Sequence, residues 1–453
     1  MTDIPRVVVA GTSSGAGKTS VACGLIAALR SRGHVVQGFK VGPDYIDPSY
    51  HALASARPGR NLDAFLSGPE LIAPLFEHGA AGADITVIEG VMGLFDGASG
   101  RGELASTAHV AKLLDAPVLL VIDAAAMARS AAAIVHGYMT FDPAVSIAGV
   151  IVNKVGSDHH VELLREAIEP LGVPVVGALR RDERMAAPER HLGLVPAIER
   201  EPRTRGAIDA LSEAVLAHVD LDGVTALARS APALTGEAWS AAGETTRSAT
   251  IAIARGHAFS FHYEENLELL RAAGATLAPF DPMTDTALPA DAGALILAGG
   301  FPEIFGAELS DNAPLREDIA AFARAGRPVL AECGGLLYLC EELDGRPMCG
   351  VLPARGKMAG RLSIGYREAV AQGPSALWDS GEHVRGHEFH YSAVYGDATA
   401  AWELTARGKT RTEGFAAGAV HASYLHVHWA AFPRAARRLV EAAARQPAGA
   451  SWA

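Results

Sequence analysis

The stretch VVVAGTSSGAGKTS, residues 7–20, decides the fold of the first part of this chain. A run of β-branched residues enters a glycine-rich loop, and the loop ends in Gly-Lys-Thr at residues 17–19. Backbone N–H groups of such a loop, and of the helix that follows it, can surround phosphate oxygens, and the helix dipole favours negative charge there. The order of strand, glycines, Gly-Lys-Thr and helix therefore predicts a phosphate-binding loop rather than an ordinary turn.

This loop is one residue longer than the common phosphate-binding loop. Five residues separate Gly11 from Gly17, whereas the common spacing is four. Lys18 is expected to reach the terminal phosphates of a nucleotide, and the hydroxyl of Thr19 is expected to contact Mg²⁺. The residues expected to bind ATP are Ser13, Gly15, Ala16, Gly17, Lys18, Thr19, Ser20 and, after the second strand, Lys40.

Apolar runs alternate with Ala- and Leu-rich stretches over residues 6–180. Runs that are apolar throughout suit strands that are buried on both faces of a parallel sheet. They lie at 6–10, 35–40, 85–89, 118–122 and 147–153. A helix is expected between the first two runs, with Gly33 as its C-terminal cap. This alternation predicts a doubly wound α/β domain.

The pattern weakens between residues 181 and 247, which are rich in charge and proline. A new strand is expected at Thr250, and a second α/β alternation then extends to about residue 440. We therefore expect two doubly wound α/β domains, at 1–225 and 248–440, joined by a polar linker at 226–247.

Composition disfavours several classes of partner. The chain has 453 residues, of which 49% are hydrophobic, and its formal net charge is −12. Nucleic acids and anionic membranes require a basic surface, so neither is an expected partner. We find no apolar run of about 18 residues that would predict a transmembrane helix. Four cysteines without a Cys-x-x-Cys pair favour a reducing, cytoplasmic location.

Acidic residues follow two of the expected strands, in FKVGPDYIDPSYH (39–51) and ITVIEGVMGLFDG (85–97). The carboxyl ends of parallel strands form the ligand-binding edge of such a sheet. Asp47 and Glu89 are therefore candidates to hold Mg²⁺, which prefers oxygen ligands. Taken alone, the first segment could instead be a turn built from Asp and Pro, but the combination with the phosphate loop favours a site.

The second half contains a candidate nucleophile in RPVLAECGGLLYL. A buried strand, a sharp turn at Cys333 and a helix form the arrangement of a nucleophile elbow. A thiolate at a helix N-terminus is expected to have a lowered pKa. His426 is the candidate base, and the N–H groups of Gly300 and Gly334 are candidates for an oxyanion hole. The alternatives are an inert buried cysteine and a histidine that only packs, and the elbow together with its base disfavours both.

Each half resembles a known family. The Gly-x5-Gly-Lys-Thr loop resembles that of dethiobiotin synthetase and its relatives, which use ATP to phosphorylate a carboxylate or carbamate. The Cys333 elbow and His426 resemble the class I glutamine amidotransferases, which commonly carry His-x-Glu. Here His428 stands in place of that Glu, and Ala331 stands in place of the usual first glycine of the elbow. The resemblance is therefore to the cobyrinate-type branch, in which a Cys-His dyad is expected to suffice.

Nearly the whole chain resembles the cobyrinate (hydrogenobyrinate) a,c-diamide synthases. The segments that carry the resemblance are SSGAGKTS, FKVGPDYIDPSYH, VIEGVMGLFDG, ERHLGLVP, AGGFPE, AECGGLLYL, GHEFHYS and SYLHVHW. The resemblance implies a carbon–nitrogen ligase of cobalamin biosynthesis that uses ATP, Mg²⁺ and L-glutamine. It would amidate the a- and c-acetate side chains of a corrinoid through acyl phosphates. The first domain would be the ATP-dependent synthetase domain and the second the glutamine amidotransferase domain.

The same resemblance implies roles for individual residues. The residues implied to hold Mg²⁺ are Thr19, Asp47 and Glu89, and those implied to serve the phosphorylation site are Asp44 and Asp96. Cys333 and His426 are implied to hydrolyse glutamine. Candidates to contact corrin carboxylates or the domain interface are Tyr45, Arg361, Arg385, His387, His390 and His428. A structural, β-rich insert is the alternative for the segments around the two arginines.

Other functions share part of this pattern. A cobyric acid synthase has both modules but amidates four other side chains, and a nickel-sirohydrochlorin a,c-diamide synthase would share nearly every motif. Dethiobiotin synthetase lacks the second domain. A partitioning-type ATPase is the non-enzyme alternative, and Cys333 with His426 argues against it. The expected partners are small molecules, namely ATP, L-glutamine and a corrinoid polycarboxylate, while the oligomeric state and the metal of the macrocycle stay open.

Overall fold

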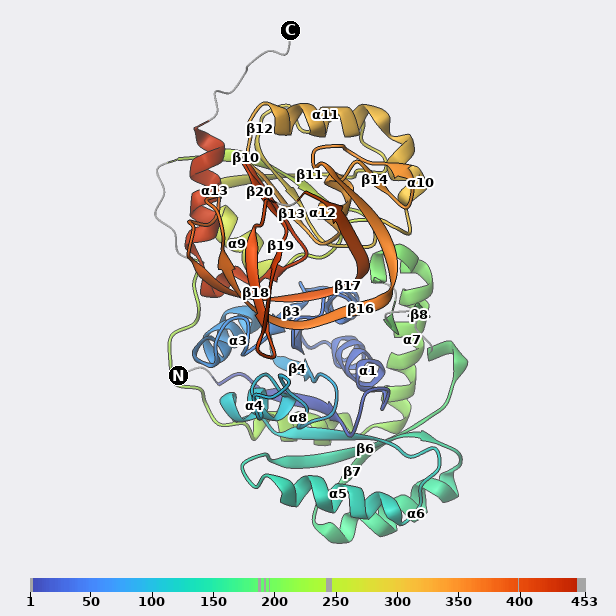
Figure 1. The fold of residues 1–453 in the computed structure, drawn as a ribbon. Coiled ribbons are helices and arrows are strands. Elements are labelled where there is room, and N and C mark those ends of the chain that lie inside the picture. Colours follow the sequence, from blue (N-terminus) through green and yellow to red (C-terminus); the bar gives the residue numbers. More distant parts are fainter. Residues whose placement is uncertain are drawn as a thin grey trace. The chain divides into compact units, whose positions relative to one another are not determined.

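The chain forms two compact units, Met1–Ser240 and Ala241–Ala453 (Figure 1). The computed structural model describes residues 3–185, 189–190, 193–194, 196–241, 247–397 and 399–445. Residues 242–246 of the expected linker, and residues 191–192 and 195 of the ERHLGLVP stretch, lie outside the described residues. Within the described ranges, no helix combines the length and the apolar character that crossing a membrane requires.

The first unit is built on a parallel sheet with the strand order β3-β2-β4-β1-β5-β6-β7. Its strands are β1 (Arg6–Gly11), β2 (Val36–Val41), β3 (Arg60–Leu62), β4 (Ile85–Glu89), β5 (Val118–Asp123), β6 (Ile147–Val155) and β7 (Val175–Arg180). Every residue of β1 and β4 is buried, as expected for strands covered on both faces. The sheet confirms the predicted doubly wound α/β architecture of this half.

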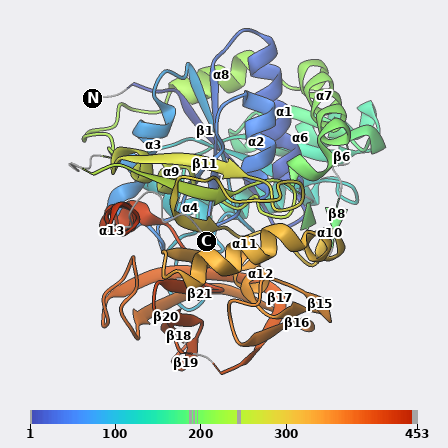
Figure 2. The same ribbon diagram turned by 90° about the horizontal axis from the view of Figure 1, so that it is seen from above.

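Helices cover both faces of this sheet (Figure 2). They are α1 (Lys18–Ser31), α2 (Asp47–Ser55), α3 (Ile72–Ala80), α4 (Thr107–Leu113), α5 (Ser130–Phe141), α6 (Asp158–Ile168), α7 (Glu201–His218) and α8 (Leu221–Arg229). Helix α1 packs closely on α7, because a Cβ atom at Gly24 would lie only 2.8 Å from Cγ2 of Val215. The segment after α8 also packs on this unit, where the Trp239 N–H donates to the carbonyl oxygen of Pro74 at 2.9 Å. The short strand β8 (Glu189–Arg190) pairs antiparallel with β9 (Gly193–Leu194).

The second unit contains a sheet with the strand order β11-β10-β12-β13-β21-β20, parallel except for the last pair. Its strands are β10 (Ala249–Ala254), β11 (Ala275–Phe280), β12 (Ala292–Leu297), β13 (Val329–Glu332), β20 (Phe415–Ala417) and β21 (Val420–Ser423). The helices of this unit are α9 (Glu264–Ala272), α10 (Gly306–Asp311), α11 (Ala313–Arg324), α12 (Gly334–Leu339) and α13 (Arg434–Ala444).

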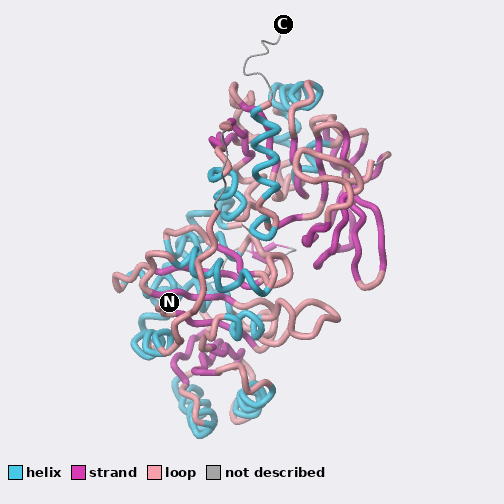
Figure 3. Tube along the Cα trace, turned by 90° about the vertical axis from the view of Figure 1, so that its left-hand side faces the viewer, coloured by secondary structure: helices cyan, strands magenta, loops and turns pink. Residues whose placement is uncertain are grey.

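A second, largely antiparallel sheet interrupts the α/β alternation that we expected to continue to residue 440 (Figure 3). Its strands are β14 (Glu342–Leu343), β15 (Arg346–Pro347), β16 (Ala354–Ala371), β17 (His383–Gly396), β18 (Trp402–Ala406), β19 (Lys409–Glu413) and β22 (His426–Val427). The long pair β16 and β17 carries the two arginine-containing segments, so these segments do lie in a β-rich insert. Strand β22 pairs with β17, which brings His426 opposite His387.

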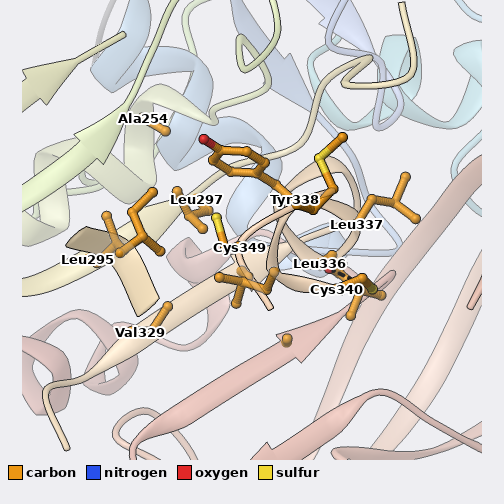
Figure 4. Close-up of a cluster of buried hydrophobic side chains, with 14 of the residues drawn as sticks. Ala254, Leu295, Leu297, Val329, Leu336, Leu337, Tyr338, Cys340 and Cys349 are labelled. Carbon is orange, nitrogen blue, oxygen red and sulfur yellow. Dashed lines mark hydrogen bonds between the residues drawn. The ribbon is translucent and has the colours of Figure 1, made fainter. Parts of the chain in front are cut away.

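Figure 4 shows part of the core of the second unit, around α12. Leu295 and Leu297 of β12 and Val329 of β13 contribute to the same buried cluster as Tyr338 of α12. Cys340 and Cys349 belong to this cluster, and all four cysteines of the chain are buried and free of disulfides. The core therefore supports the elbow between β13 and α12, and Cys340 and Cys349 occupy packing positions in it.

Candidate active sites

The phosphate loop is a closed turn that ends at the N-terminus of α1. Gly17 has a left-handed φ of 98°, and a Cβ atom there would lie 2.1 Å from Nδ2 of Asn153. Only glycine fits such a position. Nζ of Lys18 donates to the carbonyl oxygen of Ser13 at 2.9 Å, across the loop. The predicted ATP-binding residues that this loop and the first turn of α1 bring together are Ser13, Gly15, Ala16, Gly17, Lys18, Thr19 and Ser20.

Carboxylates and an ammonium group converge beside the loop. The Thr19 hydroxyl donates to Oε1 of Glu89 at 2.5 Å and lies 3.5 Å from Oδ2 of Asp47. Nζ of Lys40 lies 2.6 Å from Oδ2 of Asp47 and 2.8 Å from Oε1 of Glu89. The pairing of β2 with β4 places Lys40 directly opposite Glu89. The structure thus assembles residues that the sequence had placed on separate segments.

Burial and mutual contact set the charges of this cluster. Burial opposes the charged form of Lys40, but Asp47 and Glu89 raise its pKa. Burial likewise opposes ionisation of Glu89, yet Lys40 and His51 lower the pKa of this carboxyl. Burial raises the pKa of Asp47, and the neighbouring carboxylates of Asp44 and Glu89 add to the effect. Lys40 and Glu89 therefore form a buried ion pair, and Asp47 is the carboxyl whose charge is least compensated.

The donor set of this cluster suits Mg²⁺, which takes hydroxyl, carboxylate and water oxygens. The Thr19 hydroxyl lies within hydrogen-bonding reach of a carboxylate oxygen of Asp47 and of one of Glu89. In the described part of the chain, no group of three or more His, Cys, Asp or Glu side chains could hold a metal ion. An ion bound here would therefore depend on Thr19, the two carboxylates, and oxygens of water or substrate.

His51 is a member of the cluster that sequence reasoning missed. Its Nε2 lies 2.7 Å from Oε2 of Glu89, and its side chain is fully buried. It lies on α2 four residues after Asp47, and this spacing places both side chains on one face of a helix. Gly38 of β2 makes room for it, because a Cβ atom there would lie 2.8 Å from Cβ of His51. The i, i+4 spacing was the available signal.

The other two predicted acids shape the loops around the cluster. Oδ1 of Asp44 accepts from the N–H of Ile46 at 2.6 Å and from that of Asp47 at 3.0 Å, at the start of α2. Tyr45 lies half-buried on the same loop. Oδ2 of Asp96 accepts from the N–H of Gly93 at 2.9 Å, which closes the turn after β4. Both acids thus act as turn-forming residues here, and a role in phosphorylation stays a prediction.

The turn between β13 and α12 holds Cys333 in a strained conformation, with φ 48° and ψ −97°. Its N–H donates to the carbonyl oxygen of Ser423 at 2.7 Å. The backbone passes so close to β12 that a Cβ atom at Gly335 would lie 2.1 Å from the carbonyl oxygen of Leu297. A non-glycine residue in this region costs energy and is retained where the surroundings enforce it. The observed turn has the geometry of a nucleophile elbow.

The thiol of Cys333 is not the low-pKa group that its helix position predicted. Burial raises its pKa, and the carboxylates of Glu303 and Glu332 raise it further. The N–H of Gly334 acts in the opposite direction but does not compensate. Helix α12 has only six residues, so its dipole is weak. The expectation of a lowered pKa is therefore wrong for this structure, and the resting group is a neutral thiol that needs a base.

His426 lies next to the glycine loop that follows β12. Its Cε1 atom lies 2.5 Å from where a Cβ atom of Gly299 would be. The same loop contacts the elbow, because a Cβ atom at Gly334 would lie 3.0 Å from the backbone nitrogen of Gly300. On its other side, Nδ1 of His426 lies 3.5 Å from Oε2 of Glu332. The elbow, the histidine and both candidate oxyanion glycines therefore border one loop.

The remaining predicted histidines have different partners. His428 lies against α9, with its Nε2 atom 3.4 Å from Oε2 of Glu265. His387 is buried beside His426, with ring centroids 6.0 Å apart, and burial together with His426 lowers its pKa to about 3. His390 stacks on Tyr424 at 3.6 Å. Arg385 is half-buried on β17, and Arg361 lines a separate cavity. The cavity that Arg361 lines contains none of the other five residues proposed for substrate or interface contacts.

Glu413, which sequence reasoning also missed, supports the segment before His426. Its carboxyl accepts from the Ser423 hydroxyl at 2.5 Å and from the Tyr424 N–H at 2.9 Å. Burial raises its pKa to about 7, although both hydrogen bonds favour the ionised form. Because the Ser423 carbonyl also accepts from Cys333, Glu413 holds the backbone that positions both halves of the elbow site.

Two protein families match this chain. Residues 7–195 match the CobQ/CobB/MinD/ParA nucleotide binding domain, and residues 250–433 match the CobB/CobQ-like glutamine amidotransferase domain. The first covers the phosphate loop and the carboxylate cluster, and the second covers the elbow and His426. Each match therefore contains one of the two sites described above.

Relatives with curated names align over nearly the full length. A hydrogenobyrinate a,c-diamide synthase of Streptomyces coelicolor is 52% identical, with 97% of each chain covered. Another from Mycobacterium tuberculosis H37Rv is also 52% identical, over 97% of this chain and 98% of the relative. A cobyrinate a,c-diamide synthase of Syntrophotalea carbinolica is 46% identical, over 96% and 98% respectively. With this identity over nearly its full length, the chain belongs to the family of hydrogenobyrinate and cobyrinate a,c-diamide synthases.

Proposed function

We propose that this protein amidates the a- and c-acetate side chains of hydrogenobyrinate or cobyrinate, with ATP as the activating substrate and L-glutamine as the nitrogen donor. The observation that carries the proposal is the presence of two sites in one chain. A phosphate loop lies beside Lys40, Asp47 and Glu89, and a strained Cys333 shares a loop with His426. Neither site alone makes an amide from a carboxylate.

The first site would activate the carboxylate. A carboxylate oxygen of the substrate attacks the γ-phosphorus of ATP, which gives an acyl phosphate and ADP. Lys18 and the loop N–H groups bind the phosphates, and the buried pair of Lys40 and Glu89 fixes the position of the Thr19 hydroxyl. Thr19, Asp47 and Glu89 would hold Mg²⁺, which supplies positive charge against the transferring phosphoryl group.

The second site would release ammonia from glutamine. The thiol of Cys333 gives its proton to His426 as sulfur attacks the amide carbon. The N–H groups of Gly300 and Gly334 would receive the oxyanion. Transfer of the proton from His426 to the departing nitrogen releases ammonia and leaves a glutamyl thioester, which water hydrolyses to glutamate. Ammonia then attacks the acyl carbon, phosphate leaves, and the amide forms.

Glu332 would replace the Glu of the His-x-Glu motif, which this chain lacks because His428 stands at that position. Its carboxylate faces Nδ1 of His426 at 3.5 Å, so it favours a proton on that nitrogen and leaves Nε2 as the base. Because burial raises the pKa of the Cys333 thiol, the thiol needs a base to lose its proton. The carboxylate of Glu332 would stabilise the imidazolium that forms when His426 takes this proton. Glu332 is a positioning residue in this proposal.

The test is an amidation assay with hydrogenobyrinate, cobyrinate and nickel-sirohydrochlorin side by side, each with ATP and glutamine. We expect two amides on hydrogenobyrinate or cobyrinate, detected by mass spectrometry, with ADP and glutamate formed in step. Exclusive amidation of the nickel compound would overturn the substrate assignment. Glutamine hydrolysis without amidation of any of the three would overturn it as well.

A further inference from the structure

A cavity of about 720 Å³ lies in the second unit, between the bulged part of β16 and the β18–β19 hairpin. None of the elbow residues lines this cavity. Its cationic lining residues are Arg361, Arg367, Arg407, Lys409 and Arg411. Five cations around one cavity contrast with a chain whose net charge is −12. We call these residues and the space between them the basic cavity.

Two backbone irregularities build the basic cavity. The pairing of β16 with β17 jumps from Met358 to Ser363, so four residues that include Arg361 bulge against a single residue of β17. Bulges of this kind redirect side chains and are frequent beside functional sites. The β18–β19 turn has left-handed Arg407 and Gly408, with φ of 49° and 71°. Asn or Gly is the usual residue at the first of these positions, so Arg407 is held there at an energetic cost.

Two of the five cations, Arg367 and Arg411, share the single carboxylate of Glu388, which offsets one of their two charges. Nε of Arg367 and Nη2 of Arg411 each lie 2.5 Å from a different oxygen of the buried Glu388. The exposed side chains of Arg361, Arg407 and Lys409 make no ion pair with any described residue. Three uncompensated cations at one opening attract a ligand with several negative charges.

The walls between the cations are apolar. Leu362 and Ile364 of β16 and Leu404 and Ala406 of β18 line the same cavity. Ile364 is 56% exposed, an unusual position for a large aliphatic side chain in an otherwise charged surface. A matching ligand therefore has an apolar body and several carboxylates at its edge. Glutamine is too small and carries one carboxylate, and ATP has its own phosphate loop in the first unit.

We propose that the basic cavity binds the peripheral carboxylates of the tetrapyrrole substrate, with the macrocycle against Leu362 and Ile364. This inference rests on the proposed function and names where the polycarboxylate is held on the second unit. The volume lies within the usual range for small-molecule sites, roughly 300–1,000 Å³. Arg361, Arg407 and Lys409 supply charge-assisted hydrogen bonds, and Arg367 and Arg411 are held ready by Glu388.

The experiment uses the full chain with Arg361→Gln, Arg407→Gln and Lys409→Gln, singly and combined. The matched control combines Arg271→Gln, Arg324→Gln and Arg437→Gln, which are exposed in the same unit, outside the cavity, and change the net charge equally. Binding of hydrogenobyrinate is measured by absorbance titration at several NaCl concentrations. The KM values for hydrogenobyrinate and ATP are measured with ammonium as the nitrogen source.

We expect the triple variant to raise Kd and KM for hydrogenobyrinate about tenfold or more and to weaken the salt dependence of binding. The control variant and the KM for ATP should stay at native values. Native affinity of the triple variant, while the native enzyme still amidates the macrocycle, would overturn the cavity assignment alone. Pyrophosphate binding is compared in the native protein and the triple variant by calorimetry. Weaker pyrophosphate binding together with native hydrogenobyrinate binding would assign the cavity to a phosphate ligand and overturn the proposal too. Failure of the native enzyme to amidate any macrocycle would overturn the proposed function itself.

Discussion

The carboxylate of Glu332, the residue just before the nucleophile, lies 3.5 Å from Nδ1 of His426. Both side chains are largely buried, with exposed fractions of 14% and 1%. The elbow therefore carries the proposed nucleophile and a partner for its proposed base on adjacent residues.

Glu332→Gln should lower glutamine hydrolysis by about 10- to 100-fold, because the imidazolium loses its carboxylate neighbour. The loss should appear in kcat rather than in the KM for glutamine, and Glu332→Asp should recover part of the rate. Steady-state glutaminase assays provide the measurement, together with the Tm of each variant. A lower Tm with no recovery in the aspartate variant would mean that Glu332 supports only the fold.

Cys333→Ala should abolish amidation with glutamine, a loss of roughly 10³-fold or more, while high ammonium restores product formation. The reason is that only the source of ammonia is removed. Cys340→Ala is the matched control, because that buried thiol packs in the core and should change stability without stopping glutamine hydrolysis. If ammonium fails to rescue the Cys333 variant, the residue is needed for folding rather than for chemistry.

Lys18→Ala should stop amidation from both nitrogen sources, by roughly 10²-fold or more, because the phosphates lose their cation. Glutamine hydrolysis at the elbow should continue. Lys112→Ala serves as the control, since Lys112 pairs with Glu103 and with Asp142 at 2.8 Å, away from the loop. ADP release and amide formation are measured for both variants, with ammonium as the nitrogen source. Undiminished ammonium-driven turnover would exclude Gly11–Thr19 as the ATP site.

Glu413 should make the stability of the protein fall as pH rises from 4.5 to 7. Its ordinary pKa is 4.5 and its folded pKa is about 7, so in this window only the folded state keeps the proton. The contribution is complete below pH 4.5, is lost as pH rises through 7, and amounts to at most about 3 kcal/mol.

Glu413→Gln removes this titration and keeps an acceptor for the Tyr424 N–H. The difference in Tm between the native protein and the variant should therefore shift against the native protein as pH rises from 4.5 to 7.5. Thermal unfolding followed by circular dichroism at four pH values measures it. A difference that stays constant across this range would show that another group is responsible.

The parallel strands, the phosphate-loop turn and the elbow turn could be predicted from the sequence. Runs such as Val7–Val9 are apolar throughout, so their strands are stable only when helices cover both faces of the sheet. The phosphate loop and the Cys333 elbow were found because each joins a strand to a helix through residues with special backbone demands. These are local patterns, so short segments contain all the information needed.

Features that depend on long-range packing escaped prediction. The β16–β17 pair is half-exposed and interrupted by a bulge, so its residues do not alternate regularly. The partners Glu332 and His426 are 94 residues apart, and nothing in either segment reveals the contact. The pKa of Cys333 was predicted in the wrong direction because the sequence showed its helix but not its burial or Glu303. Burial and neighbours, rather than spacing, decide such properties.

The register of β2 on β4 places Lys40 opposite Glu89. A slip of one residue would turn Lys40 to the other face of the sheet and separate it from both carboxylates. The cluster can thus exist only in molecules whose sheet has paired correctly. In a refolding experiment, phosphorylation activity therefore measures the fraction of molecules with the correct strand register. Misfolded molecules with a shifted register would be inactive, even if their secondary structure content were native.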